Sequence, residues 1–176
     1  KLMEFILDFD YDKSVVELYT ESLANTFTDE GRLSGRKWVG EQIENRLYEV
    51  SKTRSKNGYD ILGILKIKID GRLAGLAFPR EVTSKEYGQY DLNPINTYYR
   101  LSGIFIHPDF RGQGLAFKIL QWFIDEKKYV LRTADTENNS SIRVAEKADL
   151  KLKSVQQVFK NDGQDHAYDL NVYVNK

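Results

Sequence analysis

A glycine-rich turn containing one arginine joins two apolar segments of the chain. The turn consists of Arg111, Gly112, Gln113, Gly114, Leu115 and Ala116. Glycines let an anion approach backbone N–H groups that a Cβ would shield, and the first turn of a helix attracts negative charge. Arg111 adds a permanent cation. The pattern Arg-x-x-Gly-x-Ala therefore indicates a phosphate-binding turn, and the alternative is a strand-to-helix turn whose glycines only relieve strain.

Several other chemistries are disfavoured by the residue types. The turn lacks the third glycine of the dinucleotide fingerprint and the Lys-Ser/Thr pair of a nucleotide P-loop. The chain has no cysteine, which excludes disulfides, thiolate zinc sites and a cysteine nucleophile. His107 and His166 are isolated from each other and predict no metal site.

Hydrophobic periodicity predicts an alternation of strands and helices. The Asp70-Gly71 pair between two apolar runs predicts a tight hairpin. Residues 79–97 show no sustained period and are predicted to form a loop. This order of elements predicts an α+β fold, or an α/β fold, built on a mixed sheet. Strands are expected over 4–9, 61–69, 72–78, 98–106, 129–134, 152–159 and 167–174, and helices from 12, over 35–50, from 114 and over 140–148.

The length and charge of the chain limit its organisation and partners. Its 176 residues are expected to form a single domain, 1–176. Twenty-six basic residues balance 26 acidic ones, so we expect neither nucleic acid nor a membrane surface as a partner. We expect Met3 to be the natural start, with Lys1 and Leu2 added before it. Without cysteines or an apolar run of about 18 residues, we expect a cytoplasmic protein.

Four segments, in order, resemble the GNAT superfamily of acyl-CoA-dependent N-acetyltransferases. The most specific is Ile104–Ala116, which looks like the central strand, the hydrophobic-x-Pro step and the Arg-x-x-Gly-x-Ala turn. The other three are Phe5–Tyr19, Lys68–Phe78 and Asn138–Lys147. The resemblance implies a GNAT-like fold of about seven mostly antiparallel strands and about four helices. It also implies that the strands at 98–106 and 129–134 splay apart.

The resemblance further implies a site for acetyl-CoA as co-substrate, with no metal. Backbone groups of Ile104, Phe105 and Ile106 would pair with the pantetheine arm. Backbone N–H groups of Arg111, Gly112, Gln113, Gly114, Leu115 and Ala116 would hold the pyrophosphate. Asn138 would lie beside the pantetheine, with Ser141 one turn away. An amine would attack the thioester directly in a ternary complex.

The chain departs from this family where catalytic groups are common. Ala145 occupies the position at which many relatives carry a tyrosine that protonates the leaving thiolate. Arg100 and Ser102 occupy positions at which some relatives carry a carboxylate. The catalytic residues are therefore unknown. The side chains considered as a base are Glu81, Glu86, Asp91, Tyr98, Tyr99 and Tyr168, and for each an ordinary surface or packing role is the competing interpretation.

Three functions remain open from the sequence. The first is an N-acetyltransferase whose acceptor is a primary amine, either a small molecule or a protein N-terminus. The second is a catalytically degenerate acyl-CoA-binding sensor or regulatory domain, which the alanine at 145 favours. The third is a toxin-like acetyltransferase acting on charged tRNA, which the neutral net charge disfavours. The oligomeric state is open, with a homodimer as one alternative.

Overall fold

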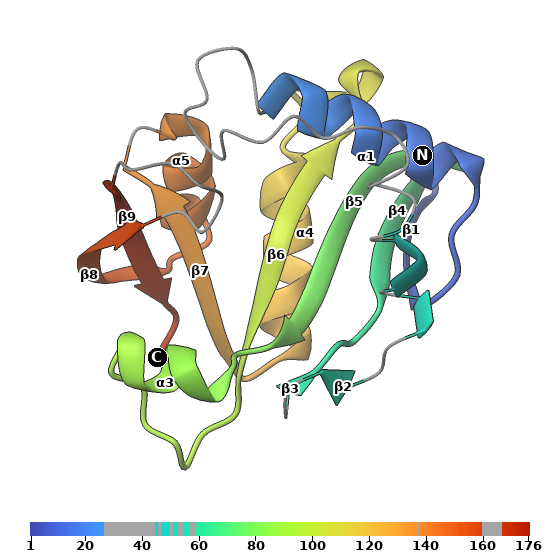
Figure 1. Ribbon diagram of the computed structural model, residues 1–176. Coiled ribbons are helices and arrows are strands. Elements are labelled where there is room, and N and C mark those ends of the chain that lie inside the picture. The colour runs from blue at the N-terminus through green and yellow to red at the C-terminus, as the bar shows by residue number, and fades with distance from the viewer. Residues whose placement is uncertain are drawn as a thin grey trace.

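The computed structural model describes residues 1–26, 45, 47–49, 51–52, 55–56, 59–136, 138–159 and 167–176. Most of the helix expected over 35–50 lies outside these residues, as does His166. Within them, one sheet has the strand order β1-β4-β5-β6-β7-β9-β8 (Figure 1). Its strands are β1 (Met3–Asp8), β4 (Ile64–Ile69), β5 (Arg72–Glu81), β6 (Tyr98–Ile106), β7 (Tyr129–Asp135), β8 (Lys151–Phe159) and β9 (Ala167–Val174).

Helices cover both faces of this sheet. They are α1 (Lys13–Thr26), α3 (Ser84–Gln89), α4 (Leu115–Glu126) and α5 (Asn139–Lys147), and a 3₁₀ turn spans Pro108–Phe110. A separate two-stranded pair consists of β2 (Ser55–Lys56) and β3 (Tyr59–Asp60). No helix in the described ranges is long and apolar enough to cross a membrane.

The mixed, mainly antiparallel sheet confirms the expected fold class. Only β6 and β7 pair in parallel, and the other neighbours in the seven-stranded sheet are antiparallel. The Asp70-Gly71 hairpin is confirmed, with both residues at positive φ (50° and 81°). Positive φ at both central positions belongs to the turn type whose twist matches the two strands it joins.

The prediction of a loop over residues 79–97 is wrong for the first half of this segment. Strand β5 continues to Glu81, and residues 84–89 form helix α3. The Thr83 hydroxyl accepts a hydrogen bond from the Glu86 N–H, and the Glu86 carboxylate accepts one from the Thr83 N–H. This reciprocal capping box satisfies two backbone donors and starts a helix in a segment without apolar periodicity.

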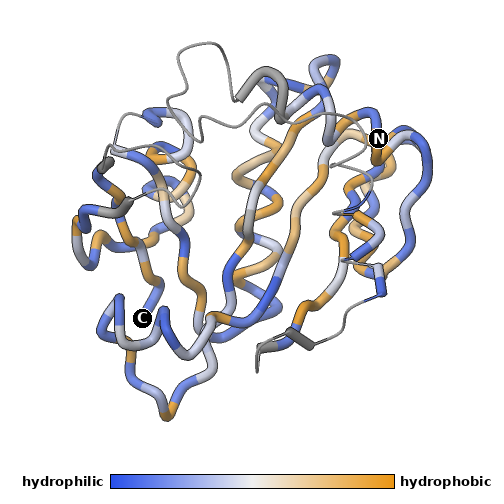
Figure 2. Tube along the Cα trace, in the orientation of Figure 1, coloured by the Kyte–Doolittle hydropathy of each residue, from blue (hydrophilic) through white to orange (hydrophobic). Residues whose placement is uncertain are grey.

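Two hydrophobic layers hold the sheet. On one face, the Tyr19 ring of α1 lies 4.9 Å from the Phe78 ring and 5.3 Å from the Phe105 ring. On the other, Ile119 and Leu120 of α4 are fully buried. Figure 2 shows hydrophobic residues concentrated along the central strands and α4. This packing fixes β6 between α1 and α4.

The central strands separate, as expected. β6 and β7 pair only at Tyr98–Tyr129, Tyr99–Val130 and Arg100–Leu131. Beyond Arg100 the two strands diverge toward the end of β6 that leads into α4 (Figure 1). The point of divergence, between Arg100 and Leu131, is called the apex below.

Candidate functional site

A groove of about 580 Å³ lies at the end of β6 that leads into α4. Its walls come from β6, from the turn before α4, and from α4 and α5. Eight of the eleven residues expected to bind the co-substrate line it: Ile104, Phe105, Ile106, Arg111, Gly112, Gly114, Leu115 and Ala116. One groove therefore contains both the strand segment and the glycine-rich turn that the sequence singled out.

The floor of the groove at the turn is open backbone. Helix α4 begins directly after Gly114, which is its N-cap, in agreement with the expected start. Gly112 and Gly114 both have positive φ (74° and 72°), and a Cβ built on either would meet nothing within 4 Å. The first N–H groups of a helix have no partner within it. An anion can therefore approach these donors and the positive end of the α4 dipole without side-chain obstruction.

Basic side chains border this open backbone. Arg111 comes from the turn itself, and Arg143 and Lys147 come from α5. The Lys147 ammonium lies 4.5 Å from the centre of the Phe117 ring, which also lines the groove. Three cations around unpaired N–H groups make this end of the groove strongly attractive to phosphates.

The start of α5 was expected at the site from the sequence, but the four α5 residues that line the groove were missed. Ser140, Arg143, Val144 and Lys147 all line the groove. Their spacing of three, four and seven residues places them on one face of a helix, which is the signal that could have identified them. Three further lining residues were also missed, Ser22, Phe110 and Phe117.

Three expected residues do not line the groove. Gln113 is exposed, and its Oε1 accepts a hydrogen bond of 3.4 Å from the Lys1 ammonium. Asn138 is the N-cap of α5, and its Oδ1 accepts a hydrogen bond of 3.1 Å from the Ser141 N–H. The Ser141 hydroxyl accepts a hydrogen bond of 3.4 Å from Arg132. Asn138 and Ser141 thus fix the start of α5, and their place beside a pantetheine stays a prediction.

Strand β6 presents backbone groups that β7 does not pair. Between Leu101 and Ile104 it carries one more residue than β5, which marks a bulge where the strands diverge. Two of its carbonyls accept from arginines instead: Leu101 from Arg132 Nη1 at 3.1 Å, and Ile106 from Arg111 Nε at 3.3 Å. Backbone between these two carbonyls is left without a β7 neighbour, which an extended ligand could use.

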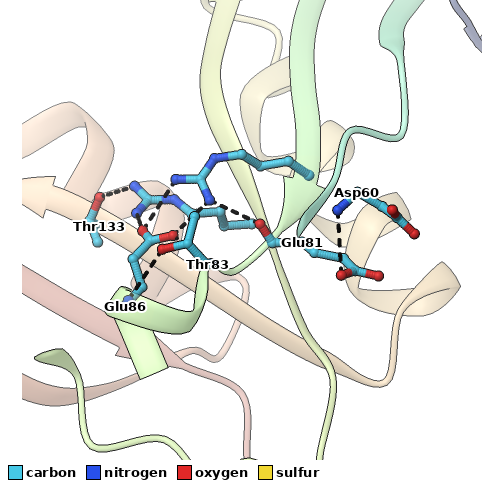
Figure 3. A network of polar contacts seen from close by, with 7 residues as sticks. Asp60, Glu81, Thr83, Glu86 and Thr133 are labelled. Atoms are coloured by element: carbon cyan, nitrogen blue, oxygen red, sulfur yellow. Dashed lines mark hydrogen bonds and ion pairs between the residues drawn. The ribbon is translucent and has the colours of Figure 1, made fainter. Parts of the chain in front are cut away.

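A charged network lies at the apex, on the face that carries α3 (Figure 3). The Glu86 carboxylate accepts from Arg80 at 2.7 Å and from Arg100 at 2.5 Å. Arg100 also donates to the Thr133 hydroxyl of β7 at 2.7 Å. Burial alone would raise the pKa of Glu86, but the hydrogen bond from Arg80 and the charge of Arg100 lower it to about 2. Glu86 is thus a committed anion and a poor proton acceptor.

The other side chains considered as a base also lack contacts that would make them proton acceptors, within the described residues. Burial raises the pKa of the Tyr98 and Tyr99 phenols, and the Tyr98 hydroxyl donates to the Lys176 carbonyl. Glu81 accepts from the Asp60 N–H at 3.5 Å. Ala145 is fully buried in the core. The side chain of Tyr168 lies outside the described part of the chain. Asp91 is exposed. Among the candidates whose side chains the structure describes, none is set up as a base by its contacts.

Comparison with known proteins identifies the family. Residues 17–149 match the sequence model of the acetyltransferase (GNAT) family. The chain belongs to the GNAT acetyltransferase family. The expected superfamily is therefore confirmed, and the splayed strands and the glycine-rich turn lie within the matched range.

Solved structures share the fold of this GNAT protein at low sequence identity. An N-acetyltransferase from Staphylococcus aureus Mu50 has a TM-score of 0.65 at 17% identity, covering 99% of this chain and 98% of its own. A GNAT acetyltransferase from Bacillus anthracis has a TM-score of 0.67 at 14% identity, covering 97% and 93%. A putative acetyltransferase from Salmonella typhimurium, solved with its cofactor acetyl-CoA, has a TM-score of 0.62 at 18% identity, covering 99% and 93%. A search of curated proteins found no match.

Proposed function

We propose that this protein transfers the acetyl group of acetyl-CoA to a primary amine, on a small molecule or a protein N-terminus. The observation that carries the proposal is the continuous groove from the N-terminus of α4 to the unpaired part of β6. One end suits phosphates and the other suits an extended, amide-bearing chain. A CoA thioester is a ligand with these two parts in this order.

The residues of the groove fit the charges and shape of CoA. The open N–H groups at Gly112 and Gly114 and the cations Arg111, Arg143 and Lys147 match a pyrophosphate and a further phosphate. Phe105 and Val144 offer apolar surface for the alkyl parts of the arm. The structure with acetyl-CoA from Salmonella typhimurium, of the same fold, supports this choice of co-substrate.

The proposed reaction needs little chemistry from side chains. The amine nitrogen attacks the thioester carbon, a C–N bond forms, the C–S bond breaks, and the proton lost by nitrogen ends on the CoA thiol. Holding the two reactants together in a site away from bulk water supplies much of the acceleration. A buried Ala145 and the absence of a placed base among the described side chains are compatible with such direct transfer.

The second candidate is a domain that binds acyl-CoA without turning it over. The burial of Ala145 favours it, because the side chain at this position can neither donate a proton nor reach the groove. The two candidates make the same prediction for binding and opposite predictions for thiol release.

A thiol-release assay separates them. The protein is mixed with acetyl-CoA and a panel of amines that includes small polyamines, amino acids and short peptides with free N-termini. We expect steady, amine-dependent release of CoA thiol above the rate without amine. Acetyl-CoA binding without release for any amine would establish the sensor instead, and no binding at millimolar acetyl-CoA would reject both.

A further inference from the structure

Arginine side chains, rather than backbone pairs, join β6 and β7 just beyond the apex. Arg100 of β6 donates across to the Thr133 hydroxyl of β7 at 2.7 Å. Arg132 of β7 donates across to the Leu101 carbonyl of β6 at 3.1 Å. Side chains alternate between the faces of a strand. Arg100 accordingly reaches α3 through Glu86, whereas Arg132 reaches α5 through Ser141.

The carboxylate at the apex, that of Glu86, is already paired with two arginines. Glu86 accepts from Arg80 and Arg100 together, and also from the Thr83 N–H. Only 11% of its side chain is exposed, and its pKa of about 2 keeps it ionised. This anion lies on the α3 face and is shared by the two arginines that it contacts, Arg80 and Arg100.

Arg132 has no such partner among the described residues. Its donors reach only neutral oxygens, the Leu101 carbonyl and the Ser141 hydroxyl, the latter at 3.4 Å. Its Nε is buried without a hydrogen-bond partner, as is the Nε of Arg100. Burial and the charge of Arg100 lower the pKa of Arg132 to about 10, so the guanidinium is still charged at neutral pH.

A half-buried cation without an anion is costly. The cost of desolvating a charge is recovered only when a counter-charge and hydrogen bonds replace water. An apolar side chain at position 132 would pack beside Val130 and Ala134, which belong to the core on the same face. We therefore expect the cation at this position to stabilise the free protein little, unless a ligand brings the missing negative charge.

We propose that the apex selects a substrate carrying a carboxylate, held by the positive charge of Arg132. The inference rests on the proposed function, which brings the reacting end of an acyl-CoA from the phosphate end of the groove to Ile104. Ile104 lies three residues along β6 from Leu101, whose carbonyl accepts from Arg132. A cation that is partly shielded from water attracts an anion over several ångströms and needs no direct contact with it. The carboxylate belongs either to the far end of a dicarboxylic acyl group or to an amino-acid acceptor.

Paired substrates distinguish these two sources. The first arm compares succinyl-CoA with butyryl-CoA as donors to one amine. The second arm keeps acetyl-CoA as donor and compares amino acids with their α-amides. We expect kcat/KM to favour the carboxylate by about tenfold or more in one arm. Equal or better use of the neutral substrate in both arms overturns the proposal.

Binding measurements separate failure of this inference from failure of the proposed function. The same pairs are compared by the shift in Tm, with CoA present in the amino-acid arm, so no turnover is needed. If no thiol is released from any pair, the transferase proposal fails, and a larger Tm shift with the carboxylate still supports the apex as its site. Equal shifts for charged and neutral partners, with no preference in turnover, reject it.

Three variants assign the selection to the charge of Arg132. Arg132→Gln removes the charge and is expected to abolish the preference by lowering only the rate with the carboxylate. Arg132→Lys keeps the charge and should retain most of the preference. The control is Lys151→Gln, because Lys151 is 75% exposed and pairs with Asp149, and it should change nothing. Equal losses for both substrates in Arg132→Gln would show a structural role and overturn the proposal.

Discussion

Arg80 and Arg100 lie directly opposite each other on β5 and β6, and both donate to the carboxylate of Glu86. Like charges in this position repel, so the pair destabilises the sheet unless an anion is held between them. Helix α3 provides that anion through its capping residue. The short helix, missed in the sequence, thus stabilises the strand that leads to the groove.

The Glu86→Gln variant is expected to lose about 3 kcal/mol of unfolding free energy. The amide cannot balance the two guanidiniums, and burial prevents water from replacing it. Urea denaturation at pH 7 measures the change. The double variant Glu86→Gln/Arg100→Gln should recover part of the loss, because it removes one of the unbalanced cations. A loss below about 0.5 kcal/mol, typical of an exposed pair, would contradict the buried network.

The same residue predicts how stability depends on pH. The pKa of Glu86 is about 2 in the folded protein and has its ordinary value of 4.5 when unfolded. Because the folded pKa is the lower one, its contribution is complete above about pH 5 and is lost as the pH falls toward 2. The stability difference between wild type and Glu86→Gln should therefore shrink between pH 5 and pH 3. A difference that stays constant over this range would show that Glu86 is not held ionised.

Removing Arg132 should cost much less stability than removing Glu86, or should increase stability. We expect Arg132→Met to keep its unfolding free energy within about 1 kcal/mol of wild type, or to raise it, because an unbalanced, half-buried charge is replaced by an apolar chain. The bond to the Leu101 carbonyl is lost, which limits the gain. Denaturation of the two proteins side by side measures the sign. A loss near that of Glu86→Gln would mean that Arg132 is a structural cation.

The sequence predicted well what depends on neighbouring residues. The hairpin at Asp70-Gly71 and the start of α4 after Gly114 follow from local turn chemistry, and both are confirmed. The splay came from the family resemblance and is also confirmed. The α3 helix was missed because its only signal is the pair Thr83 and Glu86, without apolar periodicity.

The apex could not be predicted in the same way. Its contacts join Arg100 to Thr133 and Arg132 to Leu101, across strands that are separated by a helix in the chain. Which side chains meet there depends on the three-residue parallel register of β6 and β7 and on the bulge after Leu101. Neither leaves a periodic trace in the sequence. Arg143 and Lys147 of α5 are a different case, because their spacing of four residues on one helix face can be seen in the sequence.

Those α5 cations are expected to act on co-substrate binding. The double variant Arg143→Gln/Lys147→Gln should raise the KM for acetyl-CoA roughly tenfold and leave kcat almost unchanged, because the phosphates do not react. A matched control, Lys13→Gln/Lys151→Gln, removes the same charge from exposed ion pairs on α1 and β8. Steady-state kinetics at two salt concentrations test both, and the control should match wild type. Equal effects in the two double variants would indicate net charge rather than this site.

Gly114 gives the sharpest test of the turn. Its φ of 72° means that any larger residue is strained, so a gain in stability from a side chain here is excluded. Gly114→Val should lose about 1–2 kcal/mol of stability and at least tenfold in affinity for acetyl-CoA, because the side chain enters the space above the N–H groups. Gly71 is the matched control, with a φ of 81° and equally open space in the β4–β5 turn. Gly71→Val should lose similar stability and bind normally. Melting temperature and acetyl-CoA affinity are measured on the same preparations of both variants. If Gly114→Val loses stability but binds acetyl-CoA normally, as Gly71→Val should, the turn does not bind the phosphates. Its glycines would then serve only to relieve backbone strain between β6 and α4.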